Sequence, residues 1–173
     1  MEFVSKLDGK NKIIRRIILA VFVVITYFFQ NTGGLFPTPA GIHAMLLIPL
    51  TVSIAMFERE FAGLFFGLLS GAMLDAFSSD SICFHAISLT IIGFAAGALI
   101  TYIMRNNFVC AILLTSASAF IYNTLYFILY SAFDGIEKPF IVYLRYFLPS
   151  IIYTVVFTPL YYFIVRAVSK KFK

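Results

Sequence analysis

The residues with the clearest chemical potential are four ionisable side chains near the ends of long apolar segments: His43, Asp75, His85 and Arg145. An ionisable group at or near hydrocarbon is costly and is kept where something uses it, which makes Asp75 a candidate site. Asp75 could bind a proton or ligand, anchor a partner chain, or stay solvated at the membrane boundary. Its place in the last turn of a predicted helix, where the helix dipole disfavours an anion, favours a specific partner. Because Arg145 is at a compatible depth, we expect a mainly structural Asp75–Arg145 pair.

The other polar residues predict neither a metal site nor an enzyme. His43 and His85 form a possible outer polar cluster, but neither has a neighbouring ligand at zinc-finger or zincin spacing. A single histidine at a helix end is most often a solvated interfacial residue. Ser78, Ser79 and Ser81 make a turn with no base at recognisable spacing, and no glycine loop of the phosphate-binding kind occurs. We therefore predict no catalytic residue, no metal and no cofactor.

Glycines recur every fourth residue before Asp75, and a second pair follows it. The set is Gly63, Gly67, Gly71, Gly93 and Gly97. Residues four apart are neighbours on one side of a helix, and glycine there lets a partner helix approach closely. The set therefore indicates a packing face. Two interpretations remain open, an interface with a partner subunit or contact between the two helices that carry the glycines, and we favour the second.

The composition places these residues in a membrane bundle, since 61% of the 173 residues are hydrophobic and 12% are charged. The apolar runs are continuous rather than alternating, which predicts helices and not barrel strands. Spans of about 20 residues consume the whole chain, so we expect one integral membrane domain over residues 1–173. The six predicted helices are Ile13–Phe29, His43–Phe57, Phe61–Phe77, Ile82–Met104, Val109–Phe133 and Phe140–Val168. Pro149 and Pro159 predict bends in the last helix.

Basic residues predict the orientation of this all-α bundle. With a cytoplasmic N-terminus, Lys138 and Arg145 are outside, and the rest of the thirteen Lys and Arg residues are inside. Such an asymmetry predicts that both termini are cytoplasmic, as a short basic segment over residues 1–12 and a basic tail over residues 169–173. The basic residues are at helix ends rather than along a face that could bind a nucleic-acid groove. We therefore attribute the net charge of +5 to the orientation of the chain in the membrane and expect no nucleic-acid partner.

Several of these residues resemble a known family. The run Gly67-Leu-Leu-Ser-Gly71-Ala-Met-Leu-Asp75, a short polar turn, Phe84-His85-Ala86, and then Gly93-Phe94 and Gly97 are similar to the signature region of the rod shape-determining protein MreD family. The ending from Leu148-Pro149-Ser150 through Pro159-Leu-Tyr-Tyr to a basic tail is also similar to that family. Length and six-helix layout agree over essentially the whole chain. Ile82-Cys83 departs from the pattern, because the family more usually has a glycine before the Phe84 region.

The resemblance implies a non-catalytic component of the bacterial elongation complex, multi-pass in the cell (inner) membrane. Members of this family work with MreC, the MreB cytoskeleton, the RodA glycosyltransferase and a class B penicillin-binding protein, and they coordinate lateral peptidoglycan synthesis. Partners of this kind, together with the lipid bilayer, are what the resemblance leads us to expect.

Two other classes compete with this interpretation. Substrate-binding subunits of energy-coupling-factor vitamin transporters resemble the MreD family in size, helix count and fold, and His43, Asp75, His85 and Arg145 could line an outward pocket of that kind. Such subunits commonly carry small residues four apart on the first helix, whereas here Ala20 has Arg16 four residues before it and Val24 four after. A small channel or flippase-like lipid handler would need a repeated line of polar residues, which the sequence lacks.

Overall fold

The computed structural model describes residues 2–32, 45–76, 83–131, 143 and 148–172, and these are almost entirely helical. The helices are α1 (Glu2–Asn31), α2 (Leu47–Glu58), α3 (Glu60–Asp75), α4 (Phe84–Tyr102), α5 (Phe108–Tyr126), α7 (Leu148–Val156) and α8 (Thr158–Lys171). A π-helical turn over Phe127–Ser131 extends α5. No strand occurs in the described ranges. The predicted all-α class is confirmed.

Four helical stretches are long and apolar enough to cross a membrane. They are Asn11–Asn31, Phe84–Tyr102, Phe108–Leu129 and Leu148–Lys171, and α2 is a shorter apolar helix. Each of the four has at least 19 residues, close to the roughly 20 that a bilayer core requires. The chain is therefore a polytopic membrane helix bundle.

Helix boundaries differ from the predicted ones at both ends of the chain. The first helix begins at Glu2 rather than Ile13, so the basic segment expected to precede it continues the helix. Once the apolar part forms a helix, each added Lys, Arg or Leu gains a backbone hydrogen bond at little cost in propensity. The last predicted helix is two, because α7 ends at Val156 and α8 begins at Thr158.

The break between α7 and α8 agrees with the bend expected at Pro159. Pro159 is the second residue of α8, and its ring lacks the N–H that would continue the ladder from α7. Pro149 behaves differently, since it is the second residue of α7, where proline is tolerated. The predicted start of this helix at Phe140 is outside the described residues.

Helix α2 is the centre of the bundle and contacts α1, α3, α4, α5, α7 and α8. Every residue of α2 except Phe57 is buried. Ile48 and Val52 pack in a hydrophobic cluster with α4 and α5, whereas Leu50 and Ile54 pack in a second cluster with α1, α3 and α8. A helix that is apolar on all sides is stable when it is enclosed, which accounts for this central position.

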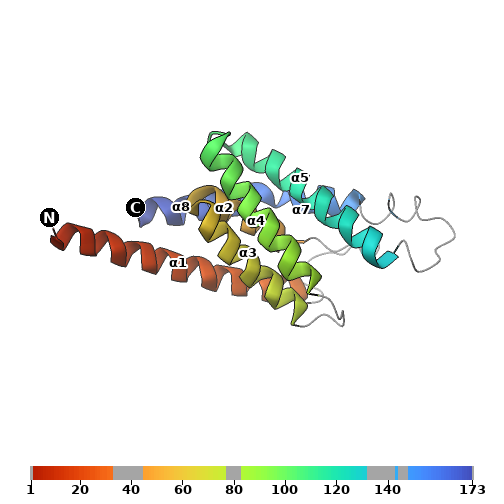
Figure 1. The fold of residues 1–173 in the computed structure, drawn as a ribbon, viewed down its shortest axis with the longest axis horizontal. Coiled ribbons are helices and arrows are strands. Elements are labelled where there is room, and N and C mark those ends of the chain that lie inside the picture. The colour runs from red at the N-terminus through yellow and green to blue at the C-terminus, as the bar shows by residue number, and fades with distance from the viewer. Residues whose placement is uncertain (1, 33–44, 77–82, 132–142, 144–147, 173) are drawn as a thin grey trace.

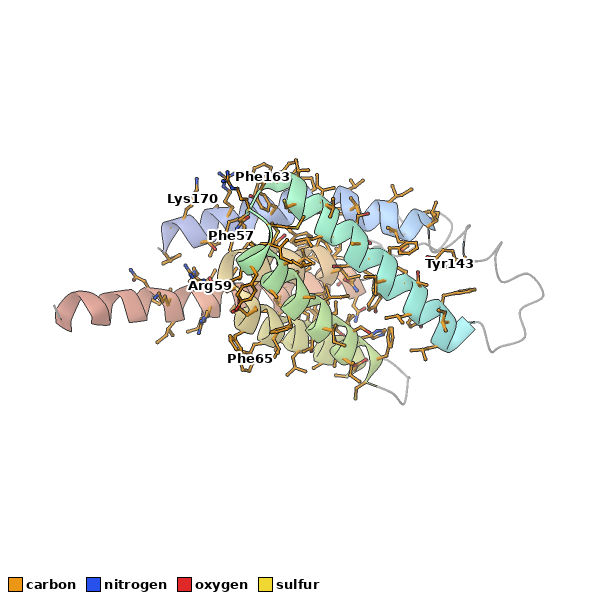
Figure 2. All side chains as sticks on the ribbon, turned by 45° about the horizontal axis from the view of Figure 1, so that its top comes forward. Phe57, Arg59, Phe65, Tyr143, Phe163 and Lys170 are labelled. Carbon is orange, nitrogen blue, oxygen red and sulfur yellow. The ribbon has the colours of Figure 1, made fainter. Side chains whose placement is uncertain are left out.

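Both termini project from the same end of the bundle (Figure 1). We call this the basic end, because Arg15, Arg16, Arg59, Arg105, Arg166, Lys170 and Lys171 all belong to it or to the helix ends that reach it. Figure 2 shows Arg59 and Lys170 toward this end and Tyr143 toward the other. The last residue of α3, Asp75, lies at the opposite end, which we call the Asp75 end.

Candidate functional site

Helices α3 and α4 run antiparallel and lie directly against each other (Figure 1). Gly63 and Gly93 face each other, so a Cβ atom added to either would overlap the carbonyl oxygen of the other. A Cβ on Gly67 would likewise overlap the carbonyl of Leu89. The two backbones are therefore in contact with no side chain between them, an approach that only glycine permits.

The same contact continues to both ends of the helix pair. At the Asp75 end, a Cβ on Gly71 would overlap the backbone of Ala86. At the basic end, a Cβ on Gly97 would be 2.6 Å from the Cα atom of Glu60. The five predicted glycines thus lie in one interface between α3 and α4, and all five are buried within the chain. Of the two interpretations of the glycine set, the structure has the contact between the two helices of the same chain.

Asp75 links the end of α3 to the start of α4. Its Oδ2 accepts a hydrogen bond from the backbone N–H of Ala86 at 2.7 Å, and its Oδ1 accepts one from the N–H of His85 at 3.1 Å. The residue before α4, Cys83, makes no side-chain cap of its own. Asp75 therefore acts as an N-cap supplied by the preceding helix. The positive end of the α4 dipole stabilises the carboxylate and offsets the unfavourable end of α3.

His85 extends this contact to α5. Its Nδ1 is hydrogen-bonded to the hydroxyl of Tyr122 at 2.7 Å, and its ring stacks on Tyr126 with centroids 5.9 Å apart. The residue is 8% exposed. The expectation of a solvated interfacial histidine is wrong for His85, because Tyr122 and Tyr126 pack against the ring and the Tyr122 hydroxyl is the hydrogen-bond partner of Nδ1.

Two of the predicted site residues, His43 and Arg145, are outside the described residues. The Asp75–Arg145 pair and the outer polar cluster with His43 therefore stay predictions. What the described residues bring together at the Asp75 end is Asp75, His85, Tyr122 and Tyr126.

A buried charge cluster at the basic end was missed by the sequence interpretation. Glu58, the last residue of α2, forms an ion pair between its Oε1 and Nε of Arg15 on α1. The Nε of Arg16 is 3.7 Å from Oε2 of the same carboxylate. The side chain of Glu58 is 1% exposed, so it requires such partners. Two arginines and a glutamate at the same predicted membrane edge were the available signal.

The single residue between α2 and α3 has an unusual backbone. Arg59 has φ 72° and ψ −179°, a region occupied almost entirely by glycine. This conformation turns the chain directly from α2 into α3, so that Glu60 reaches the position against Gly97. On the neighbouring α4–α5 connection, Asn106 donates a hydrogen bond to the carbonyl of Met56 at 2.8 Å. This contact ties the end of α2, just before the turn, to the α4–α5 connection.

Polar side chains also occur in the middle of the bundle. Thr51 on α2 donates a hydrogen bond to Ser70 on α3 at 3.2 Å. The hydroxyls of Ser53, Thr115 and Thr158 are fully buried and have no hydrogen-bond partner in the structure. They come from α2, α5 and α8, three helices that are well separated along the sequence. Among the described residues, no group of three His, Cys, Asp or Glu side chains lies close enough to hold a metal ion.

Comparisons with known proteins gave no match to this chain: no protein-family model matches it, and no curated protein or solved structure is significantly similar to it.

Proposed function

We propose that this chain is a non-catalytic membrane component of the bacterial elongation complex, of the type represented by the MreD family. The observation that supports this most is that the residues of the signature region, on α3 and α4, form one structural unit. Gly67, Gly71 and Asp75 on α3 contact the backbone of α4 at Leu89, Ala86 and His85. A signature that is scattered along 31 residues is thus a single interface, as expected if it serves one structural purpose.

The unit suits a scaffold. Close backbone contact and a cross-helix cap make α3 and α4 a rigid hairpin, whose outward faces carry exposed apolar side chains such as Leu68 on α3 and Ile87 and Ile91 on α4. Membrane-spanning partners can pack on such faces without competing for the glycines. The partners we propose are MreC, with RodA, a class B penicillin-binding protein and MreB as further members of the assembly.

The proposed location is the bacterial cell membrane with both termini in the cytoplasm. The concentration of Arg and Lys at the basic end supports this orientation. A reporter that is active only in the cytoplasm, fused after Lys173, should therefore be active. An inactive cytoplasmic fusion together with an active periplasmic reporter at the same position would reverse the orientation.

The function is tested by co-expressing the tagged chain with MreC from the same organism and purifying the complex in mild detergent. MreC should remain bound after size-exclusion chromatography. Gly67→Leu should lose it because the α3–α4 hairpin is forced apart, whereas Ala72→Leu, an exposed position on the same helix, should retain it. Recovery of an ATPase module in place of wall-synthesis proteins would instead support the vitamin-transporter alternative. A folded wild-type chain that binds neither MreC nor a synthase would overturn the proposal.

A further inference from the structure

A second feature of the basic end is an open groove between α1 and α3. Its volume is about 470 Å³. Its lining residues are Ile13, Arg16, Ile17, Ala20, Phe61, Ala62, Phe65 and Phe66. All of these side chains are apolar except Arg16. The groove is part of the surface that a membrane-spanning chain presents to lipid.

Arg16 gives the groove a positive charge at one end. Its side chain is 61% exposed, and its contact with Glu58 is a single 3.7 Å approach of Nε. Arg15 is the closer partner of that carboxylate and is only 15% exposed. The guanidinium of Arg16 has five N–H donors in a planar fork that matches a phosphate group, so it can pair with an anion outside the protein. Lys12, exposed and one helical turn earlier, adds charge on the same side of α1.

Along α1, charged side chains lie at the basic end of the groove and apolar side chains line its inner part, like the headgroup and acyl chain of a lipid. Lys12 and Arg16 are nearer to the basic end, with the apolar Ile13 between them, and Ile17 and Ala20 follow toward the bundle centre. On the facing helix, Ala62 and Phe65 are similarly arranged after the turn at Arg59. A ligand that fits both parts has an anionic group at the membrane surface and a flexible apolar chain that extends into the bilayer.

We propose that the α1–α3 groove binds an anionic phospholipid of the leaflet at the basic end, with its phosphate at Arg16 and one acyl chain between Ile17, Ala20 and Phe65. Basic residues at the membrane surface attract anionic lipids at about 1 kcal/mol each, so the charge complementarity selects this lipid class over zwitterionic lipids. The site is separate from the α3–α4 glycine contact, because it uses the other side of α3. It does not depend on the function proposed above.

The absence of tryptophan from the chain makes a direct test possible. Phe65→Trp places a single fluorophore in the groove, and Leu113→Trp places one on an exposed part of α5. Each position is the sixth residue of a helix that begins at the basic end, so both lie at a similar depth. The full chain is reconstituted into phosphatidylcholine vesicles, and fluorescence quenching by brominated phosphatidylglycerol is compared with quenching by brominated phosphatidylcholine.

The expected result is a preference for phosphatidylglycerol of about fivefold in the Phe65→Trp variant, the factor that one basic residue provides, and no preference in the Leu113→Trp variant. In the Phe65→Trp background, Arg16→Gln should abolish the preference and Arg16→Lys should keep most of it. Ala20→Phe should fill the groove and reduce quenching by both brominated lipids.

Equal quenching of the groove fluorophore by the two lipids would overturn the proposal. The same preference for phosphatidylglycerol at the α5 fluorophore would overturn it too, because the charge would then act on the whole surface rather than at the groove. This comparison needs only the two tryptophan variants, so it decides even if Arg16→Gln does not fold.

Discussion

The Oδ2 atom of Asp75, the last residue of α3, is 2.7 Å from the backbone nitrogen of Ala86 in the first turn of α4. The two helices are thereby joined at the Asp75 end by a side chain from one and a backbone N–H from the other. The glycines join them along the rest of their length by backbone contact. The hydrogen-bonded cap and the glycine packing contact therefore form one continuous interface between α3 and α4.

Asp75→Ala should destabilise the folded chain by about 1–2 kcal/mol, because the N–H groups of His85 and Ala86 lose their acceptor. Asp75→Asn should be milder, since an amide oxygen can accept one of these bonds. Thermal unfolding in detergent measures both changes. The matched control is Glu60→Gln at the other end of α3, whose side chain bonds Thr101 at the surface and should contribute less. Equal midpoints for Asp75→Ala and the wild type would contradict the cap.

Replacement of Gly67 by alanine should destabilise the chain by about 1–3 kcal/mol, because the added methyl group meets the backbone of Leu89 rather than a movable side chain. Gly67→Leu should lower the yield of folded protein further. Ala72→Leu, on the exposed side of the same helix, should change the unfolding free energy by less than about 0.5 kcal/mol. Unfolding by SDS titration compares the three. A wild-type midpoint for Gly67→Leu would show that α3 and α4 are further apart than described.

Removal of Arg15 should be more harmful than removal of Arg16. Arg15→Met leaves the buried carboxylate of Glu58 without its main partner, which typically costs about 3–5 kcal/mol. Arg16→Gln should cost about 0–1 kcal/mol, because that side chain is largely exposed and 3.7 Å from the carboxylate. The double variant Arg15→Met with Glu58→Leu should recover most of the loss. If the double variant loses the sum of the two single losses, the pair is not coupled.

Arg59→Gly should stabilise the chain by about 1 kcal/mol, because glycine adopts φ 72° and ψ −179° without the strain imposed by a Cβ atom. Arg59→Ala removes the same charge and keeps the Cβ, so it should give no such gain. The difference between these two variants in thermal midpoint isolates the backbone effect. An equal midpoint for both would place the turn in a different conformation.

The sequence predicted the helical class and the close contact of the helix pair, because continuous hydrophobicity and a four-residue glycine spacing are local signals; it also singled out Asp75 as a candidate site. It did not predict the partners that the structure shows for Asp75, since a cap donated by one helix to another depends on where two chain segments meet. Glu58 was missed for a related reason. The local sequence around Glu58, a polar break next to Arg59, does not reveal whether the carboxylate is solvated or covered by α1.

The burial of His85 was also not predictable from the local sequence. Its position at a helix start is ordinary for a surface histidine, and only the approach of Tyr122 from α5, 37 residues away, makes it a buried one. The break at Pro159 was predictable, because it follows from the covalent structure of proline alone.

The enclosed position of α2 constrains how the protein is made. Its 12 residues rise only about 18 Å, less than the roughly 30 Å of a bilayer core, and its hydroxyls and Glu58 are poorly suited to contact with lipid. The ribosome delivers α2 second, yet α7 and α8, which complete its enclosure, are synthesised last. Until then one side of this short, partly polar helix has no covering helix from its own chain. Release from the insertion machinery before about residue 171 would therefore leave the side of α2 that faces α7 and α8 uncovered, and we expect quality control to act on that incomplete form.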